Sequence, residues 1–442
     1  MSLDGKVTDD SPVTRVDDLV AELRAGERAG ALLVGLEHEK FIYPAQGTAP
    51  VPYEGPNGIG ALMERFARHG WAEFRETPTS PVIAMQRGKA TLSLEPGGQF
   101  ELSGAPQLTA RAAHQENLEH LAELNEHTRA LGQRVVFLGH RPFDAVATMP
   151  WMPKSRYRVM RETLGKRGPM ALEMMLMTAT GQVSLDWRSE ADCARKVTLT
   201  ARATPHLVAL FANSPLKLGA PSGFLSYRSH IWTGVDAARC GYVPAMLDGS
   251  FGYRAYVDWA LEAPLLFLRR NGQYLHPAMT FGQLLRDGFD GQPARRADWA
   301  DHLSTLFPEV RLKRVLEVRG ADCVPPALTG ALAALMRGLL YDEQALSDGL
   351  ALLRARPFAA HLELHAAARR DGLEAKDGAG TLADAALELV GIARAGLGRL
   401  DPLDAPLLDP LEALARGGKS LGRQVLDWPR DAHTVLDRAS RT

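Results

Sequence analysis

The chain has 442 residues, of which 45% are hydrophobic and 23% are charged, and its formal net charge at pH 7 is −1. This composition is typical of soluble globular proteins, and the length suits one large domain or two to three small ones. The balanced charge argues against a nucleic-acid-binding protein, and no apolar run of about eighteen residues predicts a membrane span.

The N-terminal segment and the cysteines both predict a location for the protein. The segment MSLDGKVTDDSPV is acidic and polar, so we expect no secretory signal peptide. The three cysteines, Cys193, Cys240 and Cys323, are odd in number and widely spaced. They are typical of free thiols in a reducing compartment rather than of a disulfide framework. We therefore predict a cytoplasmic protein.

Hydrophobic periodicity predicts the elements in chain order. Helices are expected over 14–30, 57–70, 110–132 and 189–212, and a loop-rich stretch over 219–255. Strands are expected over 31–43, within 81–103 on both sides of a turn, and over 134–140, 181–187 and 309–320. From about residue 327 the chain is rich in Ala and Leu and reads as helices. We predict an α+β catalytic body over 1–326 with a helical part, 327–442, packed on it; one undivided domain is the alternative.

Four of the predicted strands share one pattern. Successive side chains of a strand point to opposite faces, so each strand places polar residues on one face and apolar residues on the other. The polar faces carry Glu37 and Glu39; Gln99, Glu101 and Ser103; Thr180, Gln182, Ser184 and Asp186; and Arg311, Lys313, Glu317 and Arg319. The apolar faces, which include Leu36, Phe100 and Val183, are suited to a core.

For any single strand, a solvated sheet face is the ordinary interpretation of this pattern. Four strands of the same design, with acids and bases side by side, favour a functional face instead. Mg²⁺ prefers oxygen ligands and usually works with carboxylates and substrate phosphates, while Arg and Lys neutralise phosphate oxygens. The sequence therefore predicts Mg²⁺-nucleotide chemistry on this face.

Several segments also carry a family resemblance. They include GLEHEKF, LSLEPGGQFELSGAP, MPKSRYRVMRETL, TATGQVSLDWRSEAD, GFLSYRSHIWTGVDAARCG and HLSTLFPEVRLKRVLEVRGAD, in this order. Together they resemble the plant and proteobacterial type of glutamate–cysteine ligase, a carboxylate–amine ligase related to glutamine synthetase. The resemblance covers roughly residues 30–326 and extends weakly to GGKSLGRQVLD. A similar actinobacterial branch makes the same dipeptide for ergothioneine.

The resemblance implies a fold and a reaction. The fold is a curved, mostly antiparallel sheet with helices on its outer face. The reaction is the ATP-dependent ligation of the γ-carboxylate of glutamate to cysteine, which gives γ-glutamylcysteine through γ-glutamyl phosphate in the first step of glutathione biosynthesis. ATP and Mg²⁺ are the implied cofactors, glutamate and cysteine the substrates, and the chain is expected to act as a monomer or homodimer.

Functional residues are carried over from the matching motifs. The implied metal ligands are Glu37, Glu39, Glu101 and Glu317. Arg156 and Arg228 are implied clamps for substrate carboxylates, because arginine binds a carboxylate through two hydrogen bonds. The amino-acid pocket would include Thr180, Gln182 and Trp232. Lys313 and Arg319 would bind the nucleotide phosphates and, with Arg228, form the catalytic set.

One stretch departs from the family pattern. Met177, Ala179, Gly181 and Ser184 stand where family members commonly have Arg, Cys, Val and Asn. A γ-glutamyl ligase with another amine acceptor therefore stays open, as does a role in ergothioneine synthesis. An inactive regulatory homologue is the third alternative, against which the retained glutamates and arginines argue. The cysteine pair of the plant redox switch has no clear counterpart, so we expect no such switch.

Three smaller signals have ordinary structural interpretations. ARGGKS (415–420) lacks the first glycine of a P-loop, so a helix C-cap is expected there. His361 and His365 could bind a metal, but a surface pair is the preferred interpretation. His38 is expected on the core face of its strand, and Cys193 as a small buried residue of a helix.

Overall fold

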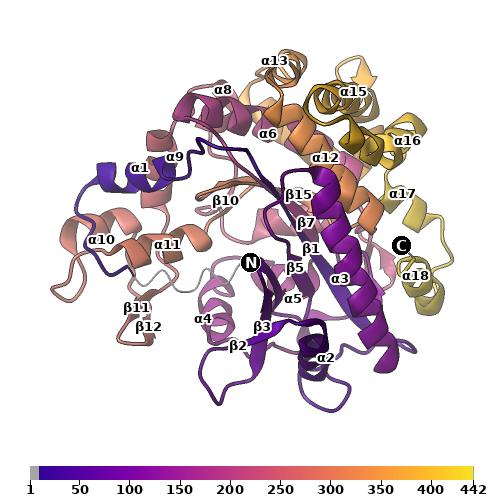
Figure 1. The fold of residues 1–442 in the computed structure, drawn as a ribbon, viewed down its shortest axis with the longest axis horizontal. Helices are drawn as coiled ribbons and strands as arrows, with labels where there is room; N and C mark the ends of the chain where they lie inside the picture. Colours follow the sequence, from indigo (N-terminus) through magenta and orange to yellow (C-terminus); the bar gives the residue numbers. More distant parts are fainter. Residues whose placement is uncertain (1–8, 442) are drawn as a thin grey trace.

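The computed structural model describes residues 9–441, and its centre is a nine-stranded antiparallel sheet (Figure 1). The strands are β1 (Val34–Pro44), β2 (Ala72–Arg75), β3 (Val82–Arg87), β4 (Ala90–Leu94), β5 (Phe100–Ser103), β6 (Gln133–Val136), β7 (Thr180–Leu185), β14 (Val310–Leu312) and β15 (Leu316–Asp322). Their order is β14-β15-β7-β1-β5-β4-β3-β2, and β6 pairs with the C-terminal part of β1. The predicted α+β class with an antiparallel sheet is confirmed.

Strand β1 is the centre of this sheet. Its first part pairs with β5 on one side and β7 on the other, and its last residues pair with β6. The alternation that the sequence shows holds here, because Leu36 and His38 are buried on the face opposite to Glu37 and Glu39. The apolar run from Phe41 to Tyr43 is buried throughout, as a fully covered strand requires.

Three long helices cover the apolar face of the sheet. They are α3 (Ala110–Ala130), α6 (Glu190–Phe211) and α12 (Pro326–Tyr341). Thr109 and Ser189 begin the first two as N-caps, because their side chains accept hydrogen bonds from backbone N–H groups of the first turn. Proline at the start of α12 is also favourable, because it lacks the N–H that would be left without a partner there.

The C-terminal helices pack on this layer (orange to yellow in Figure 1). They are α13 (Glu343–Leu352), α14 (Phe358–Asp371), α15 (Leu382–Leu400), α16 (Asp409–Gly417), α17 (Leu421–Leu426) and α18 (Ala432–Arg438). A buried carboxylate joins them to the body: Asp404 accepts hydrogen bonds from the backbone N–H of Ala110 and from Arg337. The boundary between 326 and 327 stays a prediction.

Shorter elements connect and flank these layers. They include α1 (Val16–Arg24), α2 (Ile59–Arg65), η2 (Phe66–His69), α4 (Ser155–Leu164), α5 (Ala171–Met177), α7 (Tyr227–Ile231), η4 (Trp232–Gly234), α8 (Ala245–Asp248), α9 (Tyr253–Glu262), α10 (Phe281–Asp287) and α11 (Arg296–Ser304). The short strands β10 (Cys240–Gly241) and β13 (Phe307–Pro308) form a separate parallel pair.

Two predicted strand regions differ from the structure in detail. Residues 81–103 form three strands rather than two, with an additional turn at Gly88, whose φ of +59° suits glycine. Residues 309–320 were expected as one strand but form the antiparallel hairpin β14–β15. Arg311 pairs with Glu317 across this hairpin, so both side chains stay on one face as expected. Lys313 instead lies in the turn.

The smaller predictions are largely confirmed. His38 and Cys193 are fully buried, and His38 Nε2 lies 3.1 Å from the carbonyl oxygen of Val324. Helix α16 ends before Gly418, whose φ of +66° is that of a C-cap. The predicted surface pair is wrong, because His361 and His365 are both buried; burial follows from the packing of α14 on α6.

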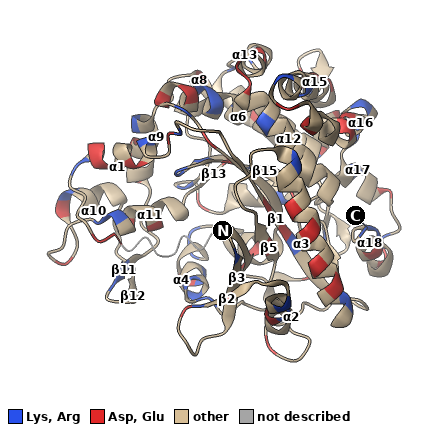
Figure 2. Ribbon diagram, in the orientation of Figure 1, with Lys and Arg blue, Asp and Glu red and all other residues tan. Residues whose placement is uncertain are grey.

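Acidic and basic residues are interspersed along the outer helices, including α3, α8 and α16 (Figure 2). Among residues 9–441, no helix has the length and apolar character that a membrane crossing requires. The first part of the N-terminal segment for which no signal peptide is expected, residues 1–8, lies outside the described residues.

Candidate active site

The polar face of the sheet forms the floor of a pocket with a volume of about 650 Å³, part of which is open to solvent. Its walls come from α4, α5, α7, η4 and β13. The lining residues are Glu37, Glu39, Glu95, Pro96, Gln99, Met160, Met174, Met175, Thr178, Thr180, Gln182, Arg228, Trp232, Phe307, Arg311 and Arg319.

Most of the site residues expected from the sequence are brought together here. Those that line the pocket are Glu37, Glu39, Thr180, Gln182, Arg228, Trp232 and Arg319. Four others, Arg156, Glu101, Lys313 and Glu317, are absent from the lining and contact residues near it. The alternation of the strands explains the first group, because the pairing of β1 with β7 places Glu37 directly opposite Gln182.

Glu101 lies beneath the pocket as the cross-strand neighbour of Glu39. It is fully buried, and two serine hydroxyls hold its carboxylate: Ser93 Oγ donates to Oε2 at 2.7 Å and Ser103 Oγ to Oε1 at 3.0 Å. Both serines are its neighbours on the same polar face. The carboxylate is therefore fixed in position next to Glu39.

Glu317 lies among cations at the other end of the floor. Its carboxylate is 2.6 Å from Arg311 Nη2, 2.9 Å from Lys313 Nζ and 3.5 Å from Arg319 Nη1. Burial alone would raise the pKa of Glu317, but these basic groups hold the pKa well below its usual range. Glu317 is thus ionised, and its charge is already offset.

In contrast to Glu317, two glutamates of the lining have raised pKa values. Burial is the largest cause that raises the pKa of Glu39 well above its usual value, and the neighbouring Glu95 and Glu101 raise it further. Burial and Glu101 raise the pKa of Glu95 to about 7. Glu95 Oε1 is buried without a hydrogen-bond partner among the described residues. This part of the floor therefore has an excess of negative charge that a bound cation would neutralise.

Glu95 is a lining residue that the strand pattern did not assign. It stands in the Glu-Pro-Gly-Gly-Gln turn between β4 and β5, where the period-two rule no longer applies. Gln99 holds this turn against α5, because its Nε2 donates to the carbonyl oxygens of Thr178 at 2.7 Å and Met175 at 3.2 Å. A glutamate beside a turn that faces an acid-rich strand is the sequence signal that could have identified it.

Arg228 is held rigidly at the pocket wall. Its Nη2 donates to the carbonyl oxygen of Arg319 at 3.2 Å, and its Nη1 lies 3.9 Å from Asp322 Oδ1. Asp322 is fixed in turn by the hydroxyls of Ser214 and Ser226, at 2.6 and 2.8 Å. This fixed guanidinium is the type of group that binds a carboxylate with defined geometry.

Arg319 is the cation at the centre of the basic side. Its Nη1 donates to Gln182 Oε1 at 2.8 Å, and its guanidinium lies 5.7 Å from the ring centre of Trp232 and 5.9 Å from that of Phe307. Burial and the nearby Arg311 lower the pKa of Arg319 to about 10. An anion bound here would relieve the repulsion among these arginines.

Arg156 does not line the pocket, and its role as a substrate clamp stays a prediction. Its Nη2 donates to the carbonyl oxygen and the hydroxyl of Ser304, at 3.2 and 3.0 Å. Its guanidinium lies 5.7 Å from the ring centre of Phe267. Arg156 joins α4 to α11 beside the pocket, where it contributes positive potential to Glu95.

Solved structures share this fold. A glutamate–cysteine ligase from Francisella tularensis in complex with AMP has a TM-score of 0.59 at 15% identity, over 94% of this chain and 89% of that chain. A bifunctional glutathione synthetase from Pasteurella multocida has a TM-score of 0.50 at 11% identity, over 97% of this chain and 54% of that one. At these identities the likeness concerns the fold.

Curated relatives are much more similar in sequence. Chloroplastic glutamate–cysteine ligases of Brassica juncea and Arabidopsis thaliana are each 38% identical, over 94% and 96% of this chain and 81% and 83% of their own lengths. One from Oryza sativa subsp. indica is 37% identical. The prediction of a cytoplasmic location is wrong by this comparison, because these relatives are named as chloroplastic proteins.

The family assignment rests on nearly the whole chain. The profile of glutamate–cysteine ligase family 2 matches residues 33–441, which include every residue of the pocket. The resemblance noted in the sequence is confirmed, and the chain belongs to glutamate–cysteine ligase family 2.

Proposed function

We propose that the protein joins the γ-carboxylate of glutamate to the amino group of cysteine, with ATP as the energy source and γ-glutamyl phosphate as the intermediate. The observation that carries this proposal is the division of the pocket floor into an acidic and a basic part. Glu39, Glu95 and Glu101 gather on one side, and Arg228, Arg311 and Arg319 on the other. Such a floor suits a metal-nucleotide and an acidic amino acid bound together.

The acidic side fits Mg²⁺. Its donors are all carboxylate oxygens, which hard cations prefer, and Glu95 Oε1 lacks a partner among the described residues. Glu39, Glu95 and Glu101 would form one ligand group, and Glu37 with Glu317 a second. When bound, Mg²⁺ supplies neutralising charge for the phosphate oxygens. Glu317 would first have to exchange part of its contact with the basic residues.

The basic side would serve the phosphoryl transfer. An oxygen of the glutamate γ-carboxylate attacks the γ-phosphorus of ATP, and the bond from that phosphorus to the ADP oxygen breaks. Charge spreads over the phosphoryl oxygens in this step. Arg319 neutralises that charge from a position already surrounded by protein, so little reorganisation is needed. Lys313, at the hairpin turn, would assist from the rim.

The second step forms the amide. The amine of cysteine attacks the acyl carbon, the bond from that carbon to the phosphate oxygen breaks, and the amine loses a proton. Arg228 would hold the α-carboxylate of glutamate during both steps, with Thr180 and Trp232 beside it and Gln182 linking the two sides of the floor. The protein's contribution is mainly orientation and charge neutralisation.

Product analysis tests this proposal. Purified protein is incubated with ATP, Mg²⁺, glutamate and either cysteine or one of a panel of other amines, and the products are identified by mass and by nucleotide chromatography. We expect γ-glutamylcysteine with equal amounts of ADP and phosphate. AMP and pyrophosphate as products would overturn the acyl-phosphate mechanism, and a preference for another amine would overturn the cysteine assignment.

A nucleotide ligand has further support from the solved glutamate–cysteine ligase of Francisella tularensis, which holds AMP and has the same fold. The dipeptide itself is common to glutathione and ergothioneine synthesis. The proposal therefore concerns the ligation, and both pathways remain consistent with it.

A further inference from the structure

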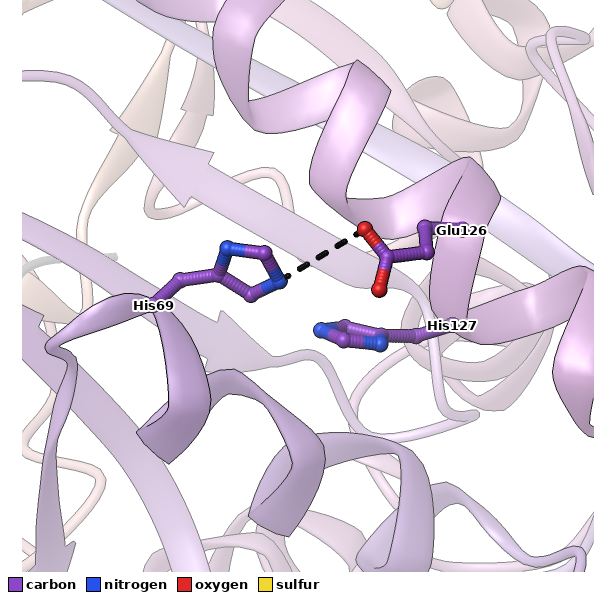
Figure 3. Close-up of side chains that lie close together, drawn as sticks. All are labelled: His69, Glu126 and His127. Carbon is purple, nitrogen blue, oxygen red and sulfur yellow. Dashed lines mark ion pairs between the residues drawn. The ribbon is translucent and has the colours of Figure 1, made fainter.

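We propose that His69, Glu126 and His127 form a second metal site, one for a divalent transition metal of the Zn²⁺ class. One potential ligand atom from each residue lies within 4.8 Å of the others. Figure 3 shows the three side chains close together, with the His69 ring facing the Glu126 carboxylate. None of the three residues lines the active-site pocket.

Two elements that are distant in sequence bring these residues together. His69 is the last residue of η2, which ends at Gly70 in a left-handed conformation with φ +78°. Glu126 and His127 belong to the last turn of α3. The C-terminal end of a helix carries partial negative charge from its dipole, which favours a cation there.

The strongest observation is His127 itself. Its side chain is 1% exposed, and its Nε2 has no hydrogen-bond partner among the described residues. Buried polar atoms in folded proteins are nearly always paired, so such an atom requires an explanation. A metal bound to the Nε2 lone pair would supply the missing partner.

A carboxylate lies near each ring nitrogen of His69. Its Nε2 lies 3.8 Å from Glu126 Oε2, while its Nδ1 lies 4.0 Å from Glu123 Oε1. Glu123 is held by Arg87 at 2.6 Å and by the indole N–H of Trp71 at 3.0 Å. At 4.0 Å the Glu123 carboxylate is beyond hydrogen-bond distance, but it lies beside the second ring nitrogen, where a metal-bound histidine usually has a carboxylate partner.

The donor set selects the class of metal. Two imidazoles and one carboxylate suit Zn²⁺ and its neighbours in the transition series, whereas Mg²⁺ requires oxygen donors. Metal–ligand bonds of about 2.0–2.1 Å place tetrahedral ligand atoms roughly 3.4 Å apart, so the side chains must approach one another on binding. Side-chain exposures of 68% for Glu126 and 28% for His69 leave room for this rotation.

The site is tested on the full chain after treatment with a chelator. Zn²⁺ binding is measured by calorimetry with excess Mg²⁺ present, so that the acidic pocket is already occupied. Cu²⁺ is then bound in place of Zn²⁺, and electron paramagnetic resonance reports whether nitrogen atoms are ligands. We expect one Zn²⁺ per chain and hyperfine coupling to two imidazole nitrogens, which an all-carboxylate site cannot give.

Variants assign the site. His69→Ala and Glu126→Gln change partly exposed groups and should each weaken Zn²⁺ binding by about a hundredfold or more, since even supporting partners of a ligand contribute 10–100-fold. His127→Phe retains a ring that packs against Phe66 and should remove the coupling of at least one of the two imidazole nitrogens. His433→Ala, at an exposed histidine on α18, is the matched control and should bind Zn²⁺ as the parent does. Unchanged binding in the first three variants, or no Zn²⁺ binding by the parent chain, would overturn the site.

Discussion

At the scale of single residues, Glu95 combines a raised pKa with a position in the pocket lining. Its carboxylate is buried beside Glu39 and Glu101, and its Oε1 has no partner among the described residues. If Glu95 holds Mg²⁺, then Glu95→Gln should lower kcat at least about a hundredfold, because a metal's charge stabilisation amounts to several kcal/mol. It should also raise the Mg²⁺ concentration needed for half-maximal rate. Steady-state kinetics across a Mg²⁺ series measures both quantities.

The matched control for this change is Glu54→Gln, which removes the same charge at an exposed position. It should leave both kinetic values unchanged. A Glu95→Gln enzyme with the parent's Mg²⁺ dependence would remove Glu95 from the ligand group.

Arg228 supports a second prediction at this scale. Its guanidinium is fixed by the carbonyl oxygen of Arg319 and by Asp322, so the group is preoriented for a carboxylate. A lysine carries the charge without the planar pair of donors. Arg228→Lys should therefore lower kcat/KM for glutamate by about tenfold or more, which corresponds to one lost charge-assisted hydrogen bond. An effect confined to the KM for cysteine would assign Arg228 to the acceptor instead.

At the scale of elements, the turn between β4 and β5 positions Glu95 and Gln99. A Cβ added at Gly97 would lie 2.2 Å from the carbonyl oxygen of Leu176, a backbone atom of α5. Gly97→Ala must therefore push the turn away from α5. We expect a loss of stability of about 1–3 kcal/mol, the usual cost of overpacking. Because the displaced turn carries Glu95, the Mg²⁺ concentration needed for half-maximal rate should also rise.

Thermal unfolding with and without Mg²⁺ measures the loss of stability and the stabilisation that Mg²⁺ gives. Gly30→Ala is the control, since nothing lies within 4 Å of the position of its added Cβ. Equal melting temperatures and equal Mg²⁺ responses for the two variants would show that the turn does not position the site.

The elements also show what the sequence could and could not predict. Alternation placed Glu37, Glu39 and Gln182 on one face correctly, because strand geometry is local. The hairpin β14–β15 was expected as one strand, yet Arg311 and Glu317 still share a face, because they pair directly across its turn. Local rules thus predicted the floor of the pocket.

The walls were not predictable in the same way. Met160, Met174 and Met175 of α4 and α5 read as ordinary apolar helix residues, and only tertiary packing places them at the pocket. Arg156 and Lys313 lie outside the pocket lining for a similar reason. A motif identifies a residue type, whereas its contacts with distant residues such as Ser304 depend on the whole fold.

At the scale of the whole molecule, the acidic pocket makes stability depend on pH. An unperturbed glutamate has a pKa of about 4.3, while the pKa of Glu95 in the folded protein is about 7 and that of Glu39 is also raised. Between these values each of these two glutamates binds more protons in the folded state than in the unfolded state, so its contribution to stability falls as pH rises. Buried histidines, including His38, His302 and His365, have lowered pKa values and oppose this effect below about pH 6.5. Without Mg²⁺, the melting temperature should therefore decrease from pH 7 to pH 8.

Mg²⁺ should reverse this trend, because it binds the ionised carboxylates of the folded state. The increase in melting temperature on adding Mg²⁺ should be larger at pH 8 than at pH 6, as differential scanning calorimetry can measure. In Glu95→Gln the decrease with pH should be smaller. A parent protein whose melting temperature rises from pH 7 to pH 8 without metal would contradict the raised pKa values.

The central position of β1 has a consequence for how the chain is made. This strand leaves the ribosome early. Its partner β7 follows much later in synthesis, and β15, which pairs with β7, follows later still. Until residue 322 has emerged, the nascent chain carries an apolar strand face and an unpaired edge. Such non-local pairing forms slowly and exposes intermediates to aggregation. We therefore expect that nascent chains stalled before β15 bind chaperones and that release of the hairpin β14–β15 ends this binding.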